Sequence, residues 1–207
     1  MKRLIIAILT ISFAVTGAFA RTALQFFADS AAIGAIPLIT PYSRLDMVDY
    51  FVNNIAKPSE NELGGKAIIL RADSTSMAFN ITSQTSCTID VAVAGKDTTL
   101  VLIETMQLPQ HDSSVRIFDK KWNPKGQPMP APDLDTWLTD EGRIHRPDVE
   151  ALIPFVLYRA AFDHSDNSIV LTHSMDSYFV DKNDIAAIAR WLKPRIKLSL
   201  DRFKPLR

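Results

Sequence analysis

The four histidines are the side chains best suited to chemistry in this chain, because an imidazole can act as a base or bind a metal near neutral pH. His111, His145, His164 and His173 are separated by 34, 19 and 9 residues. Zinc sites within one helix or strand pair use much closer spacings, such as i and i+4. The spacing therefore indicates a solvated loop histidine at His164 and a partly packed one at His173, and predicts no metal site.

A short loop offers oxygen atoms in a pattern that resembles part of a calcium site. Asp163, Ser165 and Asn167 stand at its first, third and fifth positions. An EF-hand loop also needs glycine at the sixth position and glutamate at the twelfth, where this chain has Ser168 and Ser174. Because Asp, Ser and Asn are common in tight turns, the pattern predicts a turn.

The nucleophilic side chains form no recognisable catalytic motif. No Gly-x-Ser-x-Gly turn is present to expose a serine. A hydrolase with a Ser-His-Asp triad stays an alternative, since triads are recognised by geometry. The single cysteine cannot form a disulfide within the chain, and Cys87, Ile89, Val91 and Val93 alternate with more polar residues. We therefore predict a buried Cys87 on a strand.

Residues 112–122 form the densest polar and aromatic group. One interpretation is a binding surface with exposed tryptophans, for which the candidate residues are Arg116, Lys120, Lys121, Trp122 and Trp137. The alternative is a strand with Val115 and Ile117 inside, followed by a turn in which Trp122 anchors the next segment.

Basic residues are concentrated at the C-terminus. Lys193, Arg195, Lys197, Arg202, Lys204 and Arg207 stand against Asp201 alone, a local charge of six minus one, or +5. Cations near a helix C-terminus complement the helix dipole, which accounts for the first three. The other three are candidates for contact with an anionic partner or lipid surface.

The first twenty residues have the layout of a secretory signal peptide. Lys2 and Arg3 precede an apolar stretch, and Ala18-Phe19-Ala20 is a small-x-small cleavage motif. The 16 residues 4–19 would extend about 24 Å as a helix, whereas crossing a bilayer core takes about 20 residues. We therefore predict cleavage after Ala20, a periplasmic or secreted location, and no membrane span in the mature protein.

Length and charge narrow the class of the mature protein. Removing 20 of 207 residues leaves 187, which suits one domain with its own core. The 23 basic and 23 acidic side chains become 21 and 23, a net charge of −2. Nucleic-acid binding normally requires a strongly basic surface, so nucleic acid is not expected as a partner. The sequence also predicts no cofactor.

The N-terminal half predicts a helix followed by strands. Thr40 can cap the helix and Pro41 suits its first position. A helical stripe of Leu45, Val48, Val52 and Ile55 is expected to be buried. The apolar period then changes to two, which predicts strands at 67–71, 77–81, 89–93, 100–103 and 115–118. Residues 100–103 are apolar on both faces, as in a central strand.

The C-terminal half predicts a connection, a hairpin and a helix. Four prolines within 123–132 indicate an extended surface connection. Residues 155–162 and 168–172 predict a hairpin, and a helix follows from Asp181 or Asn183. Its predicted stripe is Ile185, Ile188, Leu192 and Ile196, with a kink or restart at Pro194.

Together these elements predict an α+β fold. Short turns favour an antiparallel meander sheet of about six to seven strands. Amphipathic helices from both ends of the chain should cover one face of the sheet. We expect residues 21–207 to form a single domain.

Several runs of residues are similar to one known family. Residues 44–50, 63–66 and 112–122, the last with an Arg-Ile-Phe-Asp core, are followed by 153–155 and 192–194 in the same order. They resemble the exported Bacteroidetes family known as domain of unknown function 3256. The resemblance implies a cell-envelope location in a Gram-negative anaerobe, and it implies no established activity or catalytic residue.

The leading functional hypothesis is a non-catalytic periplasmic domain that binds an envelope protein or a small ligand through the sheet face or the proline-rich segment. A large exposed apolar patch over a solid core would favour this hypothesis. An envelope hydrolase would need convergent Ser, His and carboxylate groups. A carrier of an apolar ligand would need a dry pocket of several hundred Å³. The identity of the partner and the oligomeric state stay open.

Overall fold

The structure, a computed structural model, describes residues 21–94, 97–107, 110–175, 179 and 181–200. The predicted signal peptide 1–20 and the basic residues Arg202, Lys204 and Arg207 lie outside the described residues.

Three helices at the N-terminus are each started by a side-chain cap. They are α1 (Ala23–Ala28), the 3₁₀ helix η1 (Ser30–Gly34) and α2 (Pro41–Val52). The hydroxyl of Thr22 accepts from the backbone N–H of Gln25, and the carboxylate of Asp29 accepts from that of Ala31. The predicted start of α2 is confirmed, with Thr40 as its cap and Pro41 as its first residue.

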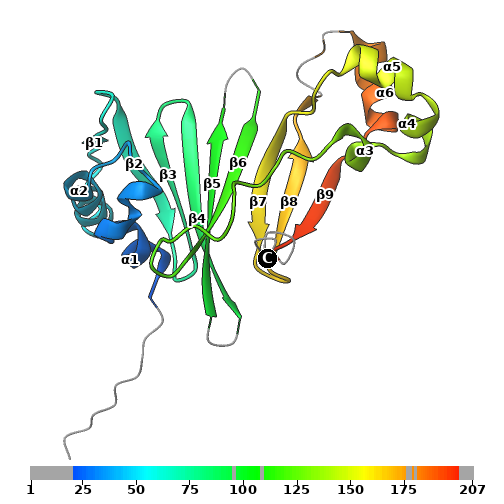
Figure 1. Cartoon of the computed structure of the whole chain (residues 1–207). Coiled ribbons are helices and arrows are strands. Elements are labelled where there is room, and N and C mark those ends of the chain that lie inside the picture. The colour runs from blue at the N-terminus through cyan, green and yellow to red at the C-terminus, as the bar shows by residue number, and fades with distance from the viewer. Residues whose placement is uncertain (1–20, 95–96, 108–109, 176–178, 180, 201–207) are drawn as a thin grey trace, which may run out of the picture.

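Six antiparallel strands form the larger sheet, and their order in the sheet is their order in the chain. They are β1 (Ser59–Glu60), β2 (Lys66–Ala72), β3 (Ser76–Thr82), β4 (Thr85–Ala94), β5 (Asp97–Met106) and β6 (Asp112–Asp119). Figure 1 shows α1 and α2 beside β1 to β4 at one end of the molecule. The α+β class, the antiparallel meander and the helices from both ends of the chain are confirmed.

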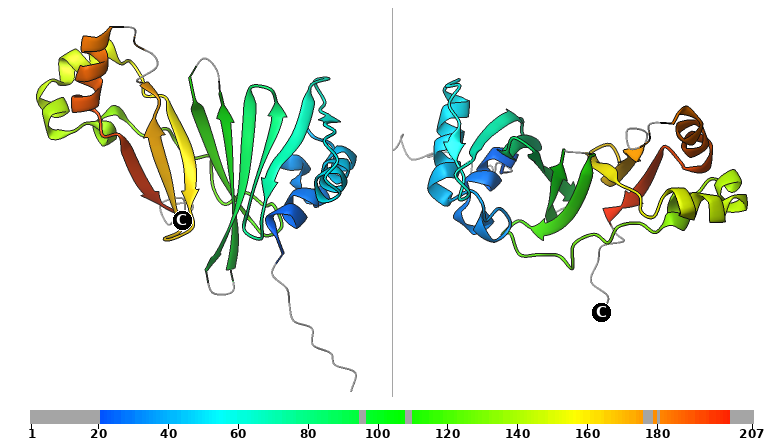
Figure 2. Two further views of the ribbon diagram at one scale, coloured as in Figure 1. Left: turned by 180° about the vertical axis from the view of Figure 1, so that it is seen from behind. Right: turned by 90° about the horizontal axis from the view of Figure 1, so that it is seen from above.

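A second sheet of three antiparallel strands lies beside β6 (Figures 1 and 2). It contains β7 (Tyr158–Asp163), β8 (Ser168–His173) and β9 (Arg195–Ser199). The predicted hairpin is therefore confirmed, but its separation from the larger sheet was not predicted. The helices α3 (Leu134–Trp137), α4 (Asp140–Ile144), α5 (Arg146–Leu152) and α6 (Lys182–Trp191) gather at one end of this sheet.

The chain around Pro194 differs from the predicted helix. Helix α6 ends at Trp191, and the chain continues as β9, so Ile196 packs from a strand and not from a helical stripe. Arg195 and Lys197 therefore do not complement a helix dipole. The ammonium of Lys197 instead pairs with the carboxylates of Asp163 and Asp166 at the β7–β8 turn.

Strand β5 contributes to two hydrophobic cores, one on each face. Leu100 and Leu102 face the core under α1 and α2. Val101 and Ile103 face the core that contains the second sheet and α6. All four are buried, as the apolar run 100–103 predicted for a central strand.

The proline-rich segment 123–132 runs along the outer edge of β6. The backbone N–H of Lys125 donates to the carbonyl of Ile117 at 2.8 Å, and that of Met129 donates to Val115 at 2.9 Å. Further along the same strand, the hydroxyl of Ser113 accepts from the N–H of Ala160 on β7. The segment is therefore a connection that covers a strand edge.

None of the helices in the described ranges combines the length and the apolar character needed to cross a bilayer.

Candidate functional site

The outer face of α2 exposes large apolar side chains. Tyr42 is 82% exposed, Leu45 is 52% exposed and Val52 is 61% exposed. Their positions differ by three and seven residues, so they follow one another along one side of the helix. We call Tyr42, Leu45 and Val52 the outer stripe.

The outer stripe corrects a prediction from the sequence. The face of Leu45, Val48, Val52 and Ile55 was expected to be buried, but only Val48 packs partly against the core. The residues that face inward are Arg44, Met47 and Phe51 instead. Helix α2 is therefore apolar on two sides, and the described part of the chain covers only one of them.

Arg44 fixes α2 against the segment before it. Its side chain is fully buried, and its guanidinium donates to the carbonyl of Ile39 at 2.8 Å and to that of Asp29 at 3.0 Å. Burial lowers the pKa of Arg44 from its ordinary value, and the nearby charge of Asp29 opposes that shift. These bonds anchor α2 to η1, and they set which side of the helix faces the core.

Two carboxylates lie beside or within the outer stripe. Asp46 and Asp49 are exposed, and neither forms an ion pair with any residue in the described part of the chain. Asp49 accepts a hydrogen bond from the side-chain amide of Asn53 at 2.9 Å. Asp46 flanks the outer stripe, and Asp49, four residues after Leu45 and three before Val52, lies within it. The outer face of α2 therefore combines apolar and acidic side chains.

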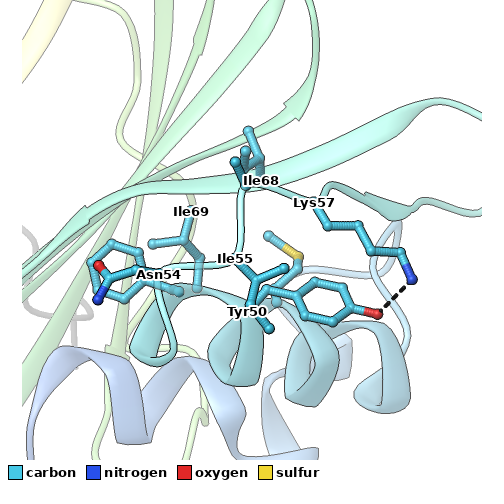
Figure 3. Close-up of a pocket in the computed structure, with 9 residues that line it drawn as sticks. Tyr50, Asn54, Ile55, Lys57, Ile68 and Ile69 are labelled. Carbon is cyan, nitrogen blue, oxygen red and sulfur yellow. Dashed lines mark hydrogen bonds between the residues drawn. The ribbon is translucent and has the colours of Figure 1, made fainter.

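A groove lies on the opposite flank of α2, between the helix, the chain that follows it, and β2 (Figure 3). Its volume is about 230 Å³. The residues that line it are Met47, Tyr50, Phe51, Asn54, Ile55, Ala56, Lys57, Ile68 and Ile69. At 100° per residue, Tyr50 is nearly opposite Leu45 and Val52 around the helix, so the groove and the outer stripe are separate surfaces.

One end of the groove carries a positive charge. The ammonium of Lys57 donates to the phenol oxygen of Tyr50 at 3.0 Å and lies 5.0 Å from the centre of that ring. This hydrogen bond raises the pKa of Lys57, and the charge of Asp46 adds to the shift. Figure 3 shows Asn54 at the other end, with Ile55 and Ile69 between.

The predicted binding residues do not form one surface. Trp122 is 5% exposed and Trp137 is 0% exposed, so the expectation that both tryptophans are exposed is wrong. They belong to different cores. The guanidinium of Arg116 donates to the carbonyl of Ala35 at 2.9 Å, beneath the N-terminal helices. Lys120 and Lys121 are exposed in the turn after β6, and their binding role stays a prediction.

Trp122 instead has the anchoring role of the alternative interpretation. Its indole N–H donates to the carbonyl of Phe26 at 3.1 Å, and its ring lies edge-on to Phe118 at 5.2 Å. Its backbone has a positive φ of 64°, which is rare for a bulky residue. The bond to α1 offsets this strain by holding the tight turn before the proline-rich segment.

His164 links the two sheets. Its Nε2 lies 3.0 Å from a carboxylate oxygen of Asp90 on β4, and the other oxygen of Asp90 accepts from the hydroxyl of Thr88. The ring of His164 also meets that of Phe162 edge-on. Among the residues that the structure describes, no serine hydroxyl hydrogen-bonds to His164, so this pair is not part of a described triad.

The structure assigns structural roles to the Asp163 turn and to Cys87. The carboxylate of Asp163 accepts from Ser165 and pairs with Lys197, which accounts for the turn without calcium. Over the described ranges, no group of three or more His, Cys, Asp or Glu side chains is arranged to hold a metal ion. Cys87 is buried as predicted, and burial raises the pKa of its thiol.

Comparison with known proteins identifies the family. Residues 18–201 match the family described as a protein of unknown function, DUF3256. The chain belongs to this family. The DUF3256 match covers the outer stripe, the groove and both sheets. The comparison with curated proteins found no match.

A solved structure is similar to this DUF3256 chain in fold. It is a domain of an uncharacterized protein from Porphyromonas gingivalis W83. The TM-score is 0.63 with 13% sequence identity, over 84% of this chain and 92% of that one. At this identity the similarity establishes the arrangement of the elements alone, and it assigns no activity.

Neither candidate surface was predicted from the sequence. The outer stripe could have been predicted from the sequence, because Met47 and Phe51 lie on one side of α2 while Leu45 and Val52 lie on another. A helix with two apolar sides predicts a partner on each. No sequence pattern indicates the groove, because Tyr50 and Ile69 come together only where β2 packs beside α2.

Proposed function

We propose that this DUF3256 protein is an exported, non-catalytic domain of the cell envelope that binds another protein through the outer stripe of α2. The exposure of Leu45 and Val52 carries the proposal. Both belong to a helical stripe of the kind that globular proteins bury. Large apolar side chains exposed on one side of a surface helix are typical of protein-interaction sites.

The two carboxylates on this face of α2 favour a basic amphipathic helix as the partner. Asp46 and Asp49 form no ion pair with a described residue, so they are available to Lys or Arg side chains of a partner. A helix laid along α2 would present apolar residues at a spacing of three and four, as in helix-in-groove recognition. Its basic residues would lie over the two carboxylates and favour association.

Pairing of two copies of α2 is disfavoured by the same charges. An antiparallel pair would bring the centres of the two helices together, and Asp49 lies near the centre of α2. Two carboxylates would then face each other in a closely packed interface. Like charges in such positions are destabilising.

The alternative functions have less support. A carrier that encloses a large apolar ligand would need a dry pocket of several hundred Å³, whereas the groove beside α2, at about 230 Å³, has room only for a short ligand. The hydrolase hypothesis needs a serine beside a histidine and a carboxylate, and the Asp90–His164 pair has no such serine among the described residues.

Export is the second part of the proposal, and its support is the arrangement of residues 1–20. The native protein is expected to begin at Arg21 when its N-terminus is sequenced after purification from cells. An Ala20→Leu variant should accumulate as the uncleaved precursor, because the small residue at the cleavage site is lost. Native protein that begins at Met1 and fractionates with the cytosol contradicts export.

Binding through the outer stripe can be tested by cross-linking in cells. A photoreactive phenylalanine analogue in place of Leu45 or Val52 is expected to cross-link to the same partner protein. The same analogue in place of Ile144, a 78% exposed residue of α4, is the matched control and should give no such product. Mass spectrometry of the product should identify an amphipathic helix that carries Lys or Arg.

With the purified partner, the contributions of single residues of α2 to the binding free energy can be measured. Leu45→Asp should weaken binding by at least about thirtyfold, as expected for a central contact worth about 2 kcal/mol. Asp49→Lys should also weaken binding, and more so at low salt. Ile144→Asp should leave binding unchanged. Cross-links between two copies of this chain, or identical products from all three positions, are incompatible with the proposal.

A further inference from the structure

The groove beside α2 has a volume that suits a short hydrocarbon chain. Its 230 Å³ corresponds to about seven or eight groups the size of a water molecule, at about 30 Å³ each. The aliphatic side chains that face it are those of Met47, Ile55 and Ile69 (Figure 3). An occupant should therefore be narrow and aliphatic over most of its length.

The charged end of the groove has hydrogen-bond donors that can contact a ligand. Lys57 uses one of its three N–H groups on the oxygen of Tyr50. That phenol oxygen accepts this bond, and no group in the described part of the chain accepts from the O–H of Tyr50, so this O–H can donate to a ligand. Within the described ranges, no carboxylate lies within ion-pair distance of Lys57. The charge of Asp46 acts on Lys57 only from a greater distance.

These donors select the head group of the occupant. One ammonium and one phenol O–H match the two oxygens of a singly charged carboxylate. A phosphate monoester carries more negative charge than the single cation at this end of the groove can balance. A neutral or cationic head group would leave the charge of Lys57 without a counterion.

We propose that this groove binds a medium-length aliphatic carboxylic acid, with its chain along Ile55 and Ile69 and its carboxylate on Lys57 and Tyr50. The site is separate from the outer stripe, and the inference does not depend on the proposed protein partner. It assigns the protein a ligand class that the family description does not contain.

Octanoate is a suitable probe, because its eight carbons match the volume of the groove. In methyl-resolved NMR of the mature protein, we expect octanoate to shift the signals of Met47, Ile55 and Ile69. Octanol has the same chain without the charge, and it should bind at least about tenfold more weakly, a difference of about 1.4 kcal/mol. Equal affinities for the two probes would overturn the inference.

Variants separate the head-group contact from the chain contact. Lys57→Met keeps the aliphatic stem and removes the charge, so octanoate should lose its advantage over octanol. Ile55→Asp should abolish binding of both probes. Lys66→Met, at an exposed lysine of β2 that does not line the groove, should change neither affinity. A Lys57→Met protein that still prefers octanoate contradicts the assignment of the carboxylate to Lys57.

Two further measurements identify the source of the carboxylate and the independence of the site. An acetylated tripeptide that ends in a leucine carboxylate should bind more weakly than octanoate; tighter binding would assign the groove to a protein C-terminus and overturn the proposal of a free acid. Leu45→Asp should leave octanoate binding unchanged, so failure of one proposal does not imply failure of the other.

Discussion

Replacing Arg44 with alanine is expected to destabilise the fold by about 3–5 kcal/mol. The fully buried guanidinium donates to the carbonyls of Ile39 and Asp29. Its removal leaves both carbonyls without this donor and opens a cavity under α2. Hydrogen bonds from a charged group contribute about 1.5–3 kcal/mol each, so the loss of two is consistent with the expected range.

Urea unfolding of the mature protein measures this effect. Arg143→Ala is the matched control, because that guanidinium pairs with Asp140 at the surface and should contribute less than about 1 kcal/mol. Arg44→Met keeps much of the packing but loses the hydrogen bonds, so it should recover only part of the loss. Equal urea midpoints for Arg44→Ala and Arg143→Ala would show that Arg44 does not anchor α2.

Replacing Trp137 with alanine is expected to cost a similar 3–5 kcal/mol, because a completely buried indole leaves a large cavity. The two buried tryptophans should differ when phenylalanine replaces them. The indole N–H of Trp122 donates to the carbonyl of Phe26, whereas that of Trp137 has no partner within the described ranges. Trp122→Phe should therefore cost about 1 kcal/mol more than Trp137→Phe from the lost hydrogen bond.

Thermal or urea unfolding of the three variants checks this order. Far-UV circular dichroism of each variant at low denaturant confirms that the fold is retained before midpoints are compared. If Trp137→Phe is less stable than Trp122→Phe, the packing of the Trp137 indole contributes more to stability than the hydrogen bond of Trp122. A Trp137→Ala protein as stable as the parent would rule out the packing role of Trp137.

The sequence predicted those parts of the fold that depend on local patterns. The alternation from Met77 to Ile81 has a period of two, and it corresponds to β3. Thr40 and Pro41 marked the start of α2 because capping depends on neighbours within one turn. The apolar run 100–103 predicted a strand buried on both faces, since only apolar residues can occupy such a strand without unpaired polar groups.

Other features depend on contacts between distant residues. Arginine is rarely fully buried, so the residue type of Arg44 does not mark it as facing inward. Two backbone carbonyls outside α2 satisfy its guanidinium, and the inward face of α2 therefore differs from the predicted stripe. The strand β9 follows Pro194 because β8 offers it a free edge, which no local pattern around Ile196 reports. The groove likewise requires Ile69 of β2 to reach the side of Tyr50.

The segment that lies along β6 has a consequence for how this protein behaves at high concentration. A bare strand edge can recruit the edge of a neighbouring molecule and start a growing stack. Here the strip that occupies this edge contains Pro124, Pro128, Pro130 and Pro132, which have no N–H to offer to a further strand. These prolines therefore cover the edge of the sheet and offer no new edge for pairing. A second molecule cannot extend the sheet from this side.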